Sequence, residues 1–406
     1  MSLATKHSDR HQSLAILATV ACKPKGPGRF ELTRKFIEGV QRYARAWDGR
    51  VVAYFLASAD DLSDLDRMTV STSEIDFEIG ISPFDETLYG EIAGRGVVLG
   101  NHFRLYDLAR RCGELGVASV YNPEYTLRTR LQFIRASRPN PLRQLRGAVW
   151  ELAEEARWTR QIRSAHGLQC NGLPSYLAYA PLNRSPLLYF DGRVTAADLV
   201  SAEELVAQNQ RRAGHESLHL VFSGRLIPAK GADHLLDVAV ALRELGVPFR
   251  MTICGDGTLK AEMEGRILGA GLGDVVTLAG VLDFSRELVP FLKREADLFV
   301  CCHRQGDPSC SYLEALACGV PIVGYANEAL ARMVEMARAG ASSPLDRPRE
   351  LARRIAEIER DRPQLCAWAE HAREFAAQHT MERTFDARIE HLRTVRDDVQ
   401  RQRHAA

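Results

Sequence analysis

Residues 298–325 read LFVCCHRQGDPSCSYLEALACGVPIVGY and contain the pattern that decides the fold. An apolar run at 298–302 gives way to a polar loop with Gly306, Asp307 and Pro308. The next residues, SYLEALA, favour a helix, and a second apolar run at 321–324 follows Gly319. This order of strand, loop, short helix and strand predicts one unit of a parallel α/β sheet.

The loop of this unit is a candidate ligand site. In an open parallel sheet, ligands bind in the loops at the carboxyl ends of the strands. The backbone N–H groups of the first helical turn would face an anion, and the hydroxyls of Ser309 and Ser311, on either side of Cys310, would add donors. Glu314 lies one turn into the helix, where its carboxylate would reach a hydroxylated ligand.

This stretch resembles the signature of the glycosyltransferase family 4 type of GT-B enzymes, which is E-x7-E followed by A-x-A-C-G-x-P-I-V. Residues 314–323, EALACGVPIV, match its second half. The position of the first glutamate is Gly306, and the nearest carboxylate is Asp307, one residue further on. In the family the second glutamate holds the ribose hydroxyls and the first contacts the transferring sugar. The resemblance implies ribose binding for Glu314 and leaves Asp307 as the candidate for the sugar contact.

A second candidate site is the sequence GRLIPAKG at 224–231, which follows a strand-like run. Arg225 and Lys230 lie five residues apart on one loop, so they can converge on a diphosphate and stabilise the charge that grows on a leaving group. Taken alone, the pair is also compatible with two surface charges. In the resembling family the motif G-R-x-x-x-x-K-G supplies the diphosphate contacts, which implies this role for Gly224, Arg225 and Lys230.

Two further strand ends in the same half are candidate contacts for the nucleotide. Gly255 and Gly257, after the strand MTIC, permit close approach of the backbone to a ligand. The resembling family seats the nucleotide base near the positions of Val281 and Leu282. Nothing in that sequence distinguishes uracil from guanine, so the resemblance implies a UDP- or GDP-linked donor.

The N-terminal half begins with a predicted strand at 14–20, the basic loop CKPKGPGRF and a helix from about 31 to 47. A glycine-bearing loop before a helix suits a phosphate or sugar at the helix N-terminus, although an ordinary turn with solvated lysines is the alternative. The resemblance implies that Gly26 and Gly28 are contacts. Further strands are expected at 50–56, 75–81, 96–100 and 117–121, which predicts a doubly wound parallel sheet.

Two residues of this half are candidates for a catalytic role. His102 follows one predicted strand in VVLGNHF, where a structural or surface role is the alternative. The family often carries a histidine at the end of the next strand, near the sugar. Here that place reads YNPEY, so Glu124 lies where the histidine is expected. Either Glu124 or His102 could substitute for it, and the sequence does not decide between them.

Residues 125–149 contain six arginines and no acidic residue. Leu127, Leu131 and Ile134 recur among them at helical spacing, which predicts a basic amphipathic segment. Such a segment could lie on anionic lipid or bind an acidic acceptor. The alternative is a solvated helix that packs through its leucines.

The order of the segments predicts two domains and a returning helix. Residues 1–205 would form an acceptor-side domain, with a strand, turn and helix at 168–179 near its end. The sequence RRAGHES at 211–217 is interpreted as the linker, with a boundary at about 200–215. Residues 206–380 would bind the nucleotide sugar, with helices at about 328–338, 347–360 and 363–378. The resemblance implies that a last helix at 381–406 crosses back to the first domain.

Composition excludes several classes of protein. The chain has 406 residues, enough for two or three domains, and 46% are hydrophobic. A formal net charge of +1 does not favour nucleic-acid binding. The nine cysteines are odd in number and include no C-x-x-C pair, which favours a reducing compartment and argues against structural zinc. We therefore expect no metal site and no nucleic-acid partner.

Hydropathy predicts that the protein does not span a membrane. No apolar run reaches the roughly 18 residues of a membrane span. The sequence LAILATVAC after Lys6 and Arg10 is similar to a short signal sequence, but a first strand is the favoured interpretation. We expect a cytoplasmic protein, either soluble or peripheral on the inner face of the membrane.

Together these features predict a GT-B architecture, with two Rossmann-like domains facing across a cleft. The resemblance implies a glycosyltransferase that retains anomeric configuration without a metal and uses the nucleotide sugar as substrate, with no further cofactor. The acceptor could be a glycan, a lipid-linked acceptor or a small molecule, and the oligomeric state is not predicted. The alternatives are a GT-B sugar-nucleotide epimerase or phosphorylase, and a degenerate member that binds sugar nucleotides without turnover.

Overall fold

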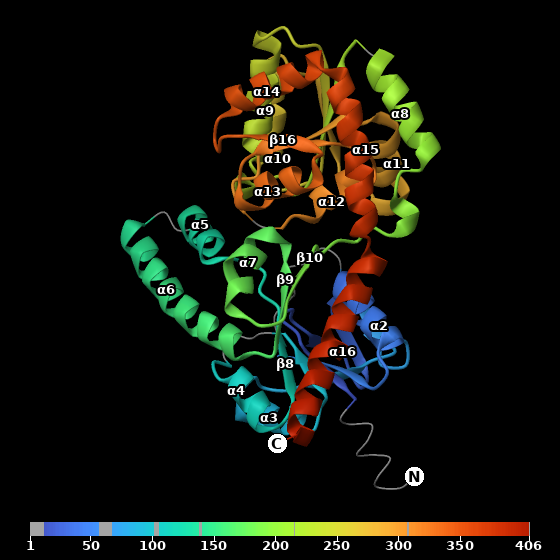
Figure 1. Ribbon diagram of the computed structural model, residues 1–406. Helices are drawn as coiled ribbons and strands as arrows, with labels where there is room; N and C mark the ends of the chain where they lie inside the picture. The colour runs from blue at the N-terminus through green and yellow to red at the C-terminus, as the bar shows by residue number, and fades with distance from the viewer. Residues whose placement is uncertain are drawn as a thin grey trace.

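The computed structural model describes residues 12–56, 67–100, 105–137, 140–214, 216–306 and 308–405. They form two α/β domains, one above the other in Figure 1, each built around a parallel sheet. The first sheet has seven strands in the order β10-β9-β8-β7-β1-β4-β6, and the second has six in the order β13-β12-β11-β14-β15-β16. These two sheets, covered by helices, confirm the predicted pair of Rossmann-like domains.

The first sheet follows the predicted alternation of strands and helices. Its central strands are apolar and buried on both faces, as expected for a parallel sheet covered on both sides. Its strands are β1 (Leu14–Leu17), β4 (Val51–Phe55), β6 (Glu78–Ile81), β7 (Val97–Leu99), β8 (Ala118–Tyr121), β9 (Gly167–Asn171) and β10 (Pro186–Tyr189). Its helices are α2 (Arg34–Ala46), α3 (Glu86–Ile92), α4 (Leu108–Glu114), α5 (Leu127–Ser137), α6 (Pro141–Ser164), α7 (Gly172–Tyr179) and η1 (Ala180–Leu182).

The predicted basic loop before α2 is instead a β-hairpin. Strands β2 (Lys23–Pro24) and β3 (Arg29–Thr33) pair antiparallel, and β3 also pairs with β5 (Arg67–Ser71), which the sequence did not predict. Gly26 and Gly28 have φ values of 120° and 64°, so they form the tight turn of this hairpin. The prediction of a loop leading directly into a helix at residue 31 was therefore wrong, because this stretch is extended and α2 begins at Arg34.

The second sheet confirms the strands predicted from residue 218 onward. Its strands are β11 (Leu218–Ser223), β12 (Phe249–Cys254), β13 (Val276–Gly280), β14 (Leu298–Cys301), β15 (Ile322–Tyr325) and β16 (Gly340–Ser343). Its helices are η3 (Pro228–Lys230), α9 (Ala232–Glu244), α10 (Lys260–Gly269), η4 (Phe284–Leu288), α11 (Val289–Glu295), α12 (Cys310–Ala317), α13 (Glu328–Ala337), α14 (Pro348–Arg360) and α15 (Arg362–Gln378).

The order of strands in the second sheet reverses beside β11. After β11, strands β12 and β13 are added on one side, and β14 then returns to the other side of β11. The carboxyl ends of β11 and β14 therefore flank a topological switch point, which is where open α/β sheets bind ligands. The two motifs found in the sequence leave the sheet from these two strands, because 224–231 follows β11 and 302–309 follows β14.

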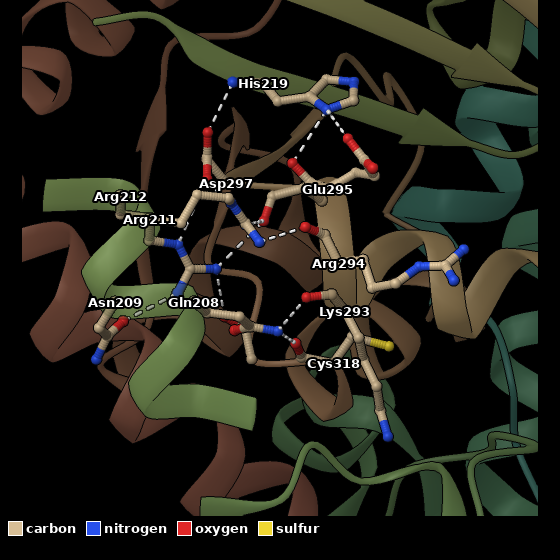
Figure 2. Close-up of polar contacts among 12 residues, drawn as sticks. Gln208, Asn209, Arg211, Arg212, His219, Lys293, Arg294, Glu295, Asp297 and Cys318 are labelled. Carbon is tan, nitrogen blue, oxygen red and sulfur yellow. Dashed lines mark hydrogen bonds and ion pairs between the residues drawn. The ribbon is translucent and has the colours of Figure 1, made fainter. Parts of the chain in front are cut away.

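The chain joins the two sheets through residues 190–201, which include η2 (Ala196–Asp198), ahead of α8 (Ala202–Gly214). Figure 2 shows how α8 is fixed on the second domain by hydrogen bonds to backbone carbonyls. Gln208 Nε2 donates to Lys293 O at 2.8 Å and to Cys318 O at 2.9 Å, and the fully buried Arg212 donates to Gly319 O at 2.8 Å. The expectation that RRAGHES is a linker was therefore wrong, because its first four residues end a helix packed on the second domain.

The last helix, α16 (Met381–Ala405), returns to the first domain and runs along its sheet (Figure 1). Its apolar side chains share a core with β1, β4, β7 and β8, and this core includes Phe385, Ile389, Leu392 and Val395. The preceding helix, α15, packs on α8 and α12 of the second domain instead. The chain thus connects the two domains twice, through 190–201 and through the junction of α15 with α16.

Candidate functional site

The carboxyl ends of the two sheets face each other at the junction of the domains. Lys35 Nζ, in the first turn of α2, donates to Asp191 Oδ2 at 2.6 Å and lies 3.5 Å from Cys310 Sγ at the start of α12. A Cβ at Gly172, the first residue of α7, would lie 3.0 Å from Pro308 Cβ. A pocket at this junction is lined by both domains, with Asn171 and Pro174 on one side and residues of 308–313 on the other.

The loop that carries Arg225 and Lys230 packs on the end of β14. Gly231 has a φ of 62°, and a Cβ there would collide with Cys302 O, so glycine allows the two loops to touch. Lys230 is 7% exposed, whereas the side chain of Arg225 is exposed. The close packing therefore brings the motif after β11 against the first residues of the motif after β14.

Gly255 and Gly257 approach the backbone of this same loop. A Cβ at Gly255 would collide with Gly224 O, and one at Gly257 would collide with Leu226 O. Leu226 N also donates to Asp256 O at 2.8 Å. The sequence predicted close backbone approach for these two glycines, and the partner found for each is the loop after β11. A direct contact of either glycine with a nucleotide stays a prediction.

A buried polar network supports the loop after β14. His303 Nδ1 lies 2.8 Å from Tyr312 Oη, while Asn327 Nδ2 donates to His303 O at 3.0 Å and to Tyr312 Oη at 3.3 Å. Burial, together with the nearby charge of Lys230, lowers the pKa of His303 well below its ordinary value. His303 is therefore neutral and fixed in place. No sequence motif would have identified this network.

Glu314 lies on α12 with 4% of its surface exposed. Its Oε1 accepts a hydrogen bond from Arg193 Nε at 2.8 Å, and the Arg193 guanidinium lies 4.1 Å from the centre of the Phe284 ring. Arg193 belongs to the segment that joins the two sheets. Phe284 begins η4, two residues after Leu282. Arg193 therefore contacts Glu314, the predicted ribose residue, and also a residue next to the predicted base region. Sequence reasoning missed this arginine.

The other residues predicted on this side have partners of their own. The hydroxyls of Ser309 and Ser311 lie 2.8 Å apart, and Ser309 is the N-cap residue of α12. Burial raises the pKa of the Cys310 thiol to about 11, so the thiol is protonated at neutral pH. Val281 is exposed and Leu282 is half-buried beyond the end of β13.

The structure gathers most but not all of the predicted residues. Gly224, Arg225, Lys230, Ser309, Ser311 and Glu314 lie around the carboxyl ends of β11 and β14. Glu124 follows β8 on the first domain and is exposed, whereas Gly26 and Gly28 lie in the hairpin turn. His102 and Asp307 lie outside the described residues.

The described part of the chain contains no group of three or more His, Cys, Asp or Glu residues that could hold a metal ion. Three cysteines near the site, Cys301, Cys302 and Cys318, are buried free thiols, and Cys310 is partly buried. In the same described ranges, no helix has both the length and the apolar character needed to cross a membrane.

Comparisons with known proteins agree with the fold and the motifs. Residues 206–375 match the family model described as glycosyl transferases group 1. The GDP-mannose-dependent alpha-(1-6)-phosphatidylinositol dimannoside mannosyltransferase of Mycobacterium tuberculosis is 32% identical over 139 residues, which are 34% of this chain and 35% of that enzyme. The match thus spans about a third of the length of this relative.

Two solved structures extend the likeness over nearly the whole chain. HepE from Anabaena, in complex with UDP, has a TM-score of 0.59 at 15% identity, and the comparison covers 97% of this chain and 100% of HepE. WaaG, a glycosyltransferase involved in lipopolysaccharide biosynthesis, has a TM-score of 0.58 at 15% identity, with 93% of this chain and 99% of WaaG covered. These likenesses confirm the predicted GT-B fold.

Proposed function

We propose that this chain, whose residues 206–375 match the family model described as glycosyl transferases group 1, is a glycosyltransferase that takes a sugar from a UDP- or GDP-linked donor. One observation carries the proposal. The loop with Arg225 and Lys230 and the helix with Glu314 leave the second sheet from neighbouring strands at its topological switch point. Two cations and a carboxylate on adjacent loops suit the diphosphate and the ribose of one nucleotide.

Each group has a distinct task in the proposed reaction. Cleavage of the sugar–phosphate bond leaves negative charge on the diphosphate, and fixed cations at Arg225 and Lys230 lower the barrier because they are in place before the charge develops. Glu314 would accept hydrogen bonds from the ribose hydroxyls in exchange for Arg193. Retention of configuration and the absence of a required metal are part of the proposal and rest on the family resemblance.

Donor binding is the first test. UDP, GDP, UDP-glucose and GDP-mannose would be screened by thermal shift and then titrated by calorimetry, since a ligand that binds the native state raises its melting temperature. Glu314→Gln should weaken nucleotide binding about tenfold or more, because hydrogen bonds to a charged acceptor contribute roughly 1.5–3 kcal/mol. Glu357→Gln is the matched control, because Glu357 pairs with Arg354 on the surface of α14.

Turnover separates a transferase from a protein that binds sugar nucleotides without reaction. Release of nucleoside diphosphate that depends on an added acceptor supports the transferase. Interconversion of the donor without an acceptor favours an epimerase. Donor binding with no turnover on any glycan, lipid-linked or small-molecule acceptor favours the degenerate binder.

We also propose that the first domain contacts an anionic membrane surface, through α6 rather than through the leucines predicted on α5. Ile134 of α5 is buried, and α5 packs against α6, so the alternative of a helix packed through its apolar residues describes α5. On the first half of α6, large apolar side chains are each more than half exposed, namely Leu142, Leu145, Val149, Trp150 and Leu152. This half of α6 lies at the outer edge of the first domain (Figure 1).

Charge on α6 favours anionic lipid as the partner. Leu142, Leu145, Val149 and Leu152 are spaced so that they share one side of the helix. Two acidic residues of α6 turn inward, because Glu151 and Glu155 pair with Arg130 of α5 at 2.8 Å and 2.5 Å. The exposed arginines Arg143 and Arg146 remain beside the apolar side, an arrangement that suits a surface of anionic headgroups over an apolar layer.

Vesicle flotation tests this contact. The protein should float with vesicles of phosphatidylglycerol and phosphatidylcholine, and not with phosphatidylcholine alone. Leu145→Glu combined with Val149→Glu should abolish flotation, whereas Leu268→Glu, at an exposed leucine of α10 on the second domain, should not. Equal flotation of all three proteins would reject the proposal and leave donor binding unaffected.

A further inference from the structure

Gly306 occupies the position at which the sequence lacks a glutamate, and the structure shows what fills the space beside it. A Cβ at Gly306 would lie 3.0 Å from Glu328 Cβ and 3.2 Å from Glu328 Oε2. Both distances are tighter than ordinary van der Waals contact. The carboxylate of Glu328 therefore stands where a side chain at position 306 would project.

Glu328 is held in this place from two directions. It is the first residue of α13, directly after Asn327, whose side chain caps the helix by accepting from Ala329 N at 3.0 Å and Leu330 N at 2.8 Å. The same Asn327 donates to His303 O, which ties the start of α13 to the loop after β14. Through these contacts, Asn327 fixes the position of Glu328 beside the loop after β14.

The partners of the Glu328 carboxylate in this structure are mostly alcohols. Thr126 Oγ1 donates to Glu328 Oε2 at 3.1 Å, Thr129 Oγ1 donates to the same oxygen at 3.4 Å, and Arg128 Nη1 lies 3.3 Å from Oε1. All three come from the first domain, across the junction from α13. The carboxylate therefore already accepts hydroxyl hydrogen bonds of the kind that a sugar offers.

The position along the site also suits the sugar end of a donor. His303 lies near Lys230, the proposed diphosphate contact, because the neighbouring Arg304 N donates to Ala229 O at 3.2 Å, and Gly306 follows three residues after His303. Three extended residues span at most about 10 Å. Glu328 thus lies within roughly the reach of a hexose that is attached to a phosphate held at Lys230.

We propose that Glu328 is the carboxylate that binds the hydroxyls of the transferring sugar, in place of a glutamate at position 306. The proposal rests on the function proposed above. When the donor binds, sugar hydroxyls replace those of Thr126 and Thr129 as hydrogen-bond donors to Glu328. Until then, the two threonines hold the carboxylate in position. Since a carboxylate accepts from two neighbouring hydroxyls at once, Glu328 would also select among sugars by the arrangement of those hydroxyls.

The test compares a nucleotide with its sugar conjugate. For whichever pair the wild type binds, UDP with UDP-glucose or GDP with GDP-mannose, Glu328→Gln should weaken binding of the nucleotide sugar about tenfold to a hundredfold. Affinity for the nucleoside diphosphate should stay at the wild-type value. Glu335→Gln, on the same helix and paired with Arg332 at 3.1 Å, is the matched control and should behave as wild type in both titrations.

A rescue variant tests whether sugar binding requires a carboxylate in the space beside position 306. Gly306 is not in the left-handed region, so its backbone accepts a side chain. In a Glu328→Gly background, which removes both the carboxylate and the Cβ that would crowd a side chain at position 306, Gly306→Glu should restore binding of the nucleotide sugar. A variant with Gly306→Glu alone should be impaired, because two carboxylates would then compete for one place.

Three results would overturn the inference while the proposed function survives. Glu328→Gln could bind the nucleotide sugar as wild type does, or it could lose the nucleoside diphosphate to the same extent. The loss could also appear in Asp307→Asn while Glu328→Gln is unaffected, which would assign the sugar contact to Asp307. A wild-type protein that binds neither nucleotide sugar would instead overturn the proposed function, and this inference with it.

Discussion

Strand β14 has an acid–arginine contact near each end, and the two contacts differ in burial. At its amino end, Asp297 is 1% exposed and accepts from His219 N at 2.8 Å and from Arg211 at 3.0 Å, with the fully buried Arg212 3.9 Å away. Beyond its carboxyl end, Glu314 accepts from Arg193, whose side chain is half-exposed. Figure 2 shows the first of these contacts inside the cluster that fixes α8.

The difference shows which contact can be exchanged for a ligand. Removing one partner of a buried pair leaves an unpaired charge in a medium of low dielectric constant, which is strongly unfavourable. A half-exposed arginine can turn to water instead, so a ligand that takes its place on the buried Glu314 carboxylate has little to overcome. We therefore interpret the Asp297 cluster as part of the structural scaffold. We interpret the contact between Glu314 and Arg193 as part of a ligand site, in which Arg193 pairs with Glu314 until a nucleotide replaces it.

The largest effect is expected on stability, at the Asp297 cluster by the amino end of β14. Asp297→Asn should lower the free energy of unfolding by about 3–5 kcal/mol, because Arg212 would stay buried without its counter-charge. Burial already lowers the pKa of Arg212 to about 10. Glu314→Gln should lower the free energy of unfolding by roughly 1 kcal/mol or less. Urea denaturation of both variants provides the measurement, and equal losses at the two ends would remove the distinction between them.

The next effect concerns turnover at the ligand end. Arg225→Ala and Lys230→Met should each lower kcat about 10²- to 10³-fold, the range found when one preorganised donor to a developing charge is removed. Affinity for the nucleoside diphosphate should change much less, because the charge on the leaving group is larger in the transition state. Arg250→Ala is the control, since Arg250 pairs with Glu295 on the surface. Equal losses in kcat and affinity would make both residues ordinary binding groups.

Sequence reasoning pointed to the parts of the candidate site that are contiguous motifs. The alternation of apolar runs in 298–325 predicted β14, α12 and β15 nearly to the residue, since periodicity and glycine positions are local signals. Arg225, Lys230 and Glu314 were found in the same way, because each belongs to a short pattern with fixed spacing. The structure brings these motifs to neighbouring strands.

Residues that act through partners distant in the sequence were missed. Arg193 and Glu328 belong to no motif, and the roles proposed for them arise because the fold brings 193 to 314 and 328 to 306. The polar sequence RRAGHES was interpreted as a linker. Arg212 is instead buried, because the carbonyl oxygens of Gly319 and Ala296 accept its hydrogen bonds. Such neutral backbone partners leave no trace in a single sequence.

A third effect is the dependence of stability on pH at the scaffold end. Burial, followed by the charge of Arg250, lowers the pKa of His219 from 6.5 to about 4. The folded state therefore keeps His219 neutral, while the unfolded state takes up a proton below about pH 6.5. The stability associated with neutral His219 is complete above that pH and is lost as the pH falls from 6.5 toward 4.

Urea midpoints measured at about pH 7.5 and about pH 5 should reveal this loss, which is on the order of 2 kcal/mol for one such group. His219→Gln removes the titrating group, so the difference between the two pH values should become smaller. An unchanged pH difference in His219→Gln would mean that other groups, such as His379, whose pKa burial also lowers to about 4, account for it.

The smallest effect is expected from Arg193, and its sign is the most informative. Arg193→Gln should bind the nucleoside diphosphate about twofold to fivefold more tightly, because a half-exposed ion pair contributes at most about 1 kcal/mol and no longer competes for Glu314. Arg193→Lys keeps the charge without the planar group that lies on Phe284, so its affinity should fall between those of the wild type and Arg193→Gln. Weaker binding in Arg193→Gln would instead make Arg193 a donor contact, and the cation would then remain beside Glu314 after the nucleotide arrives.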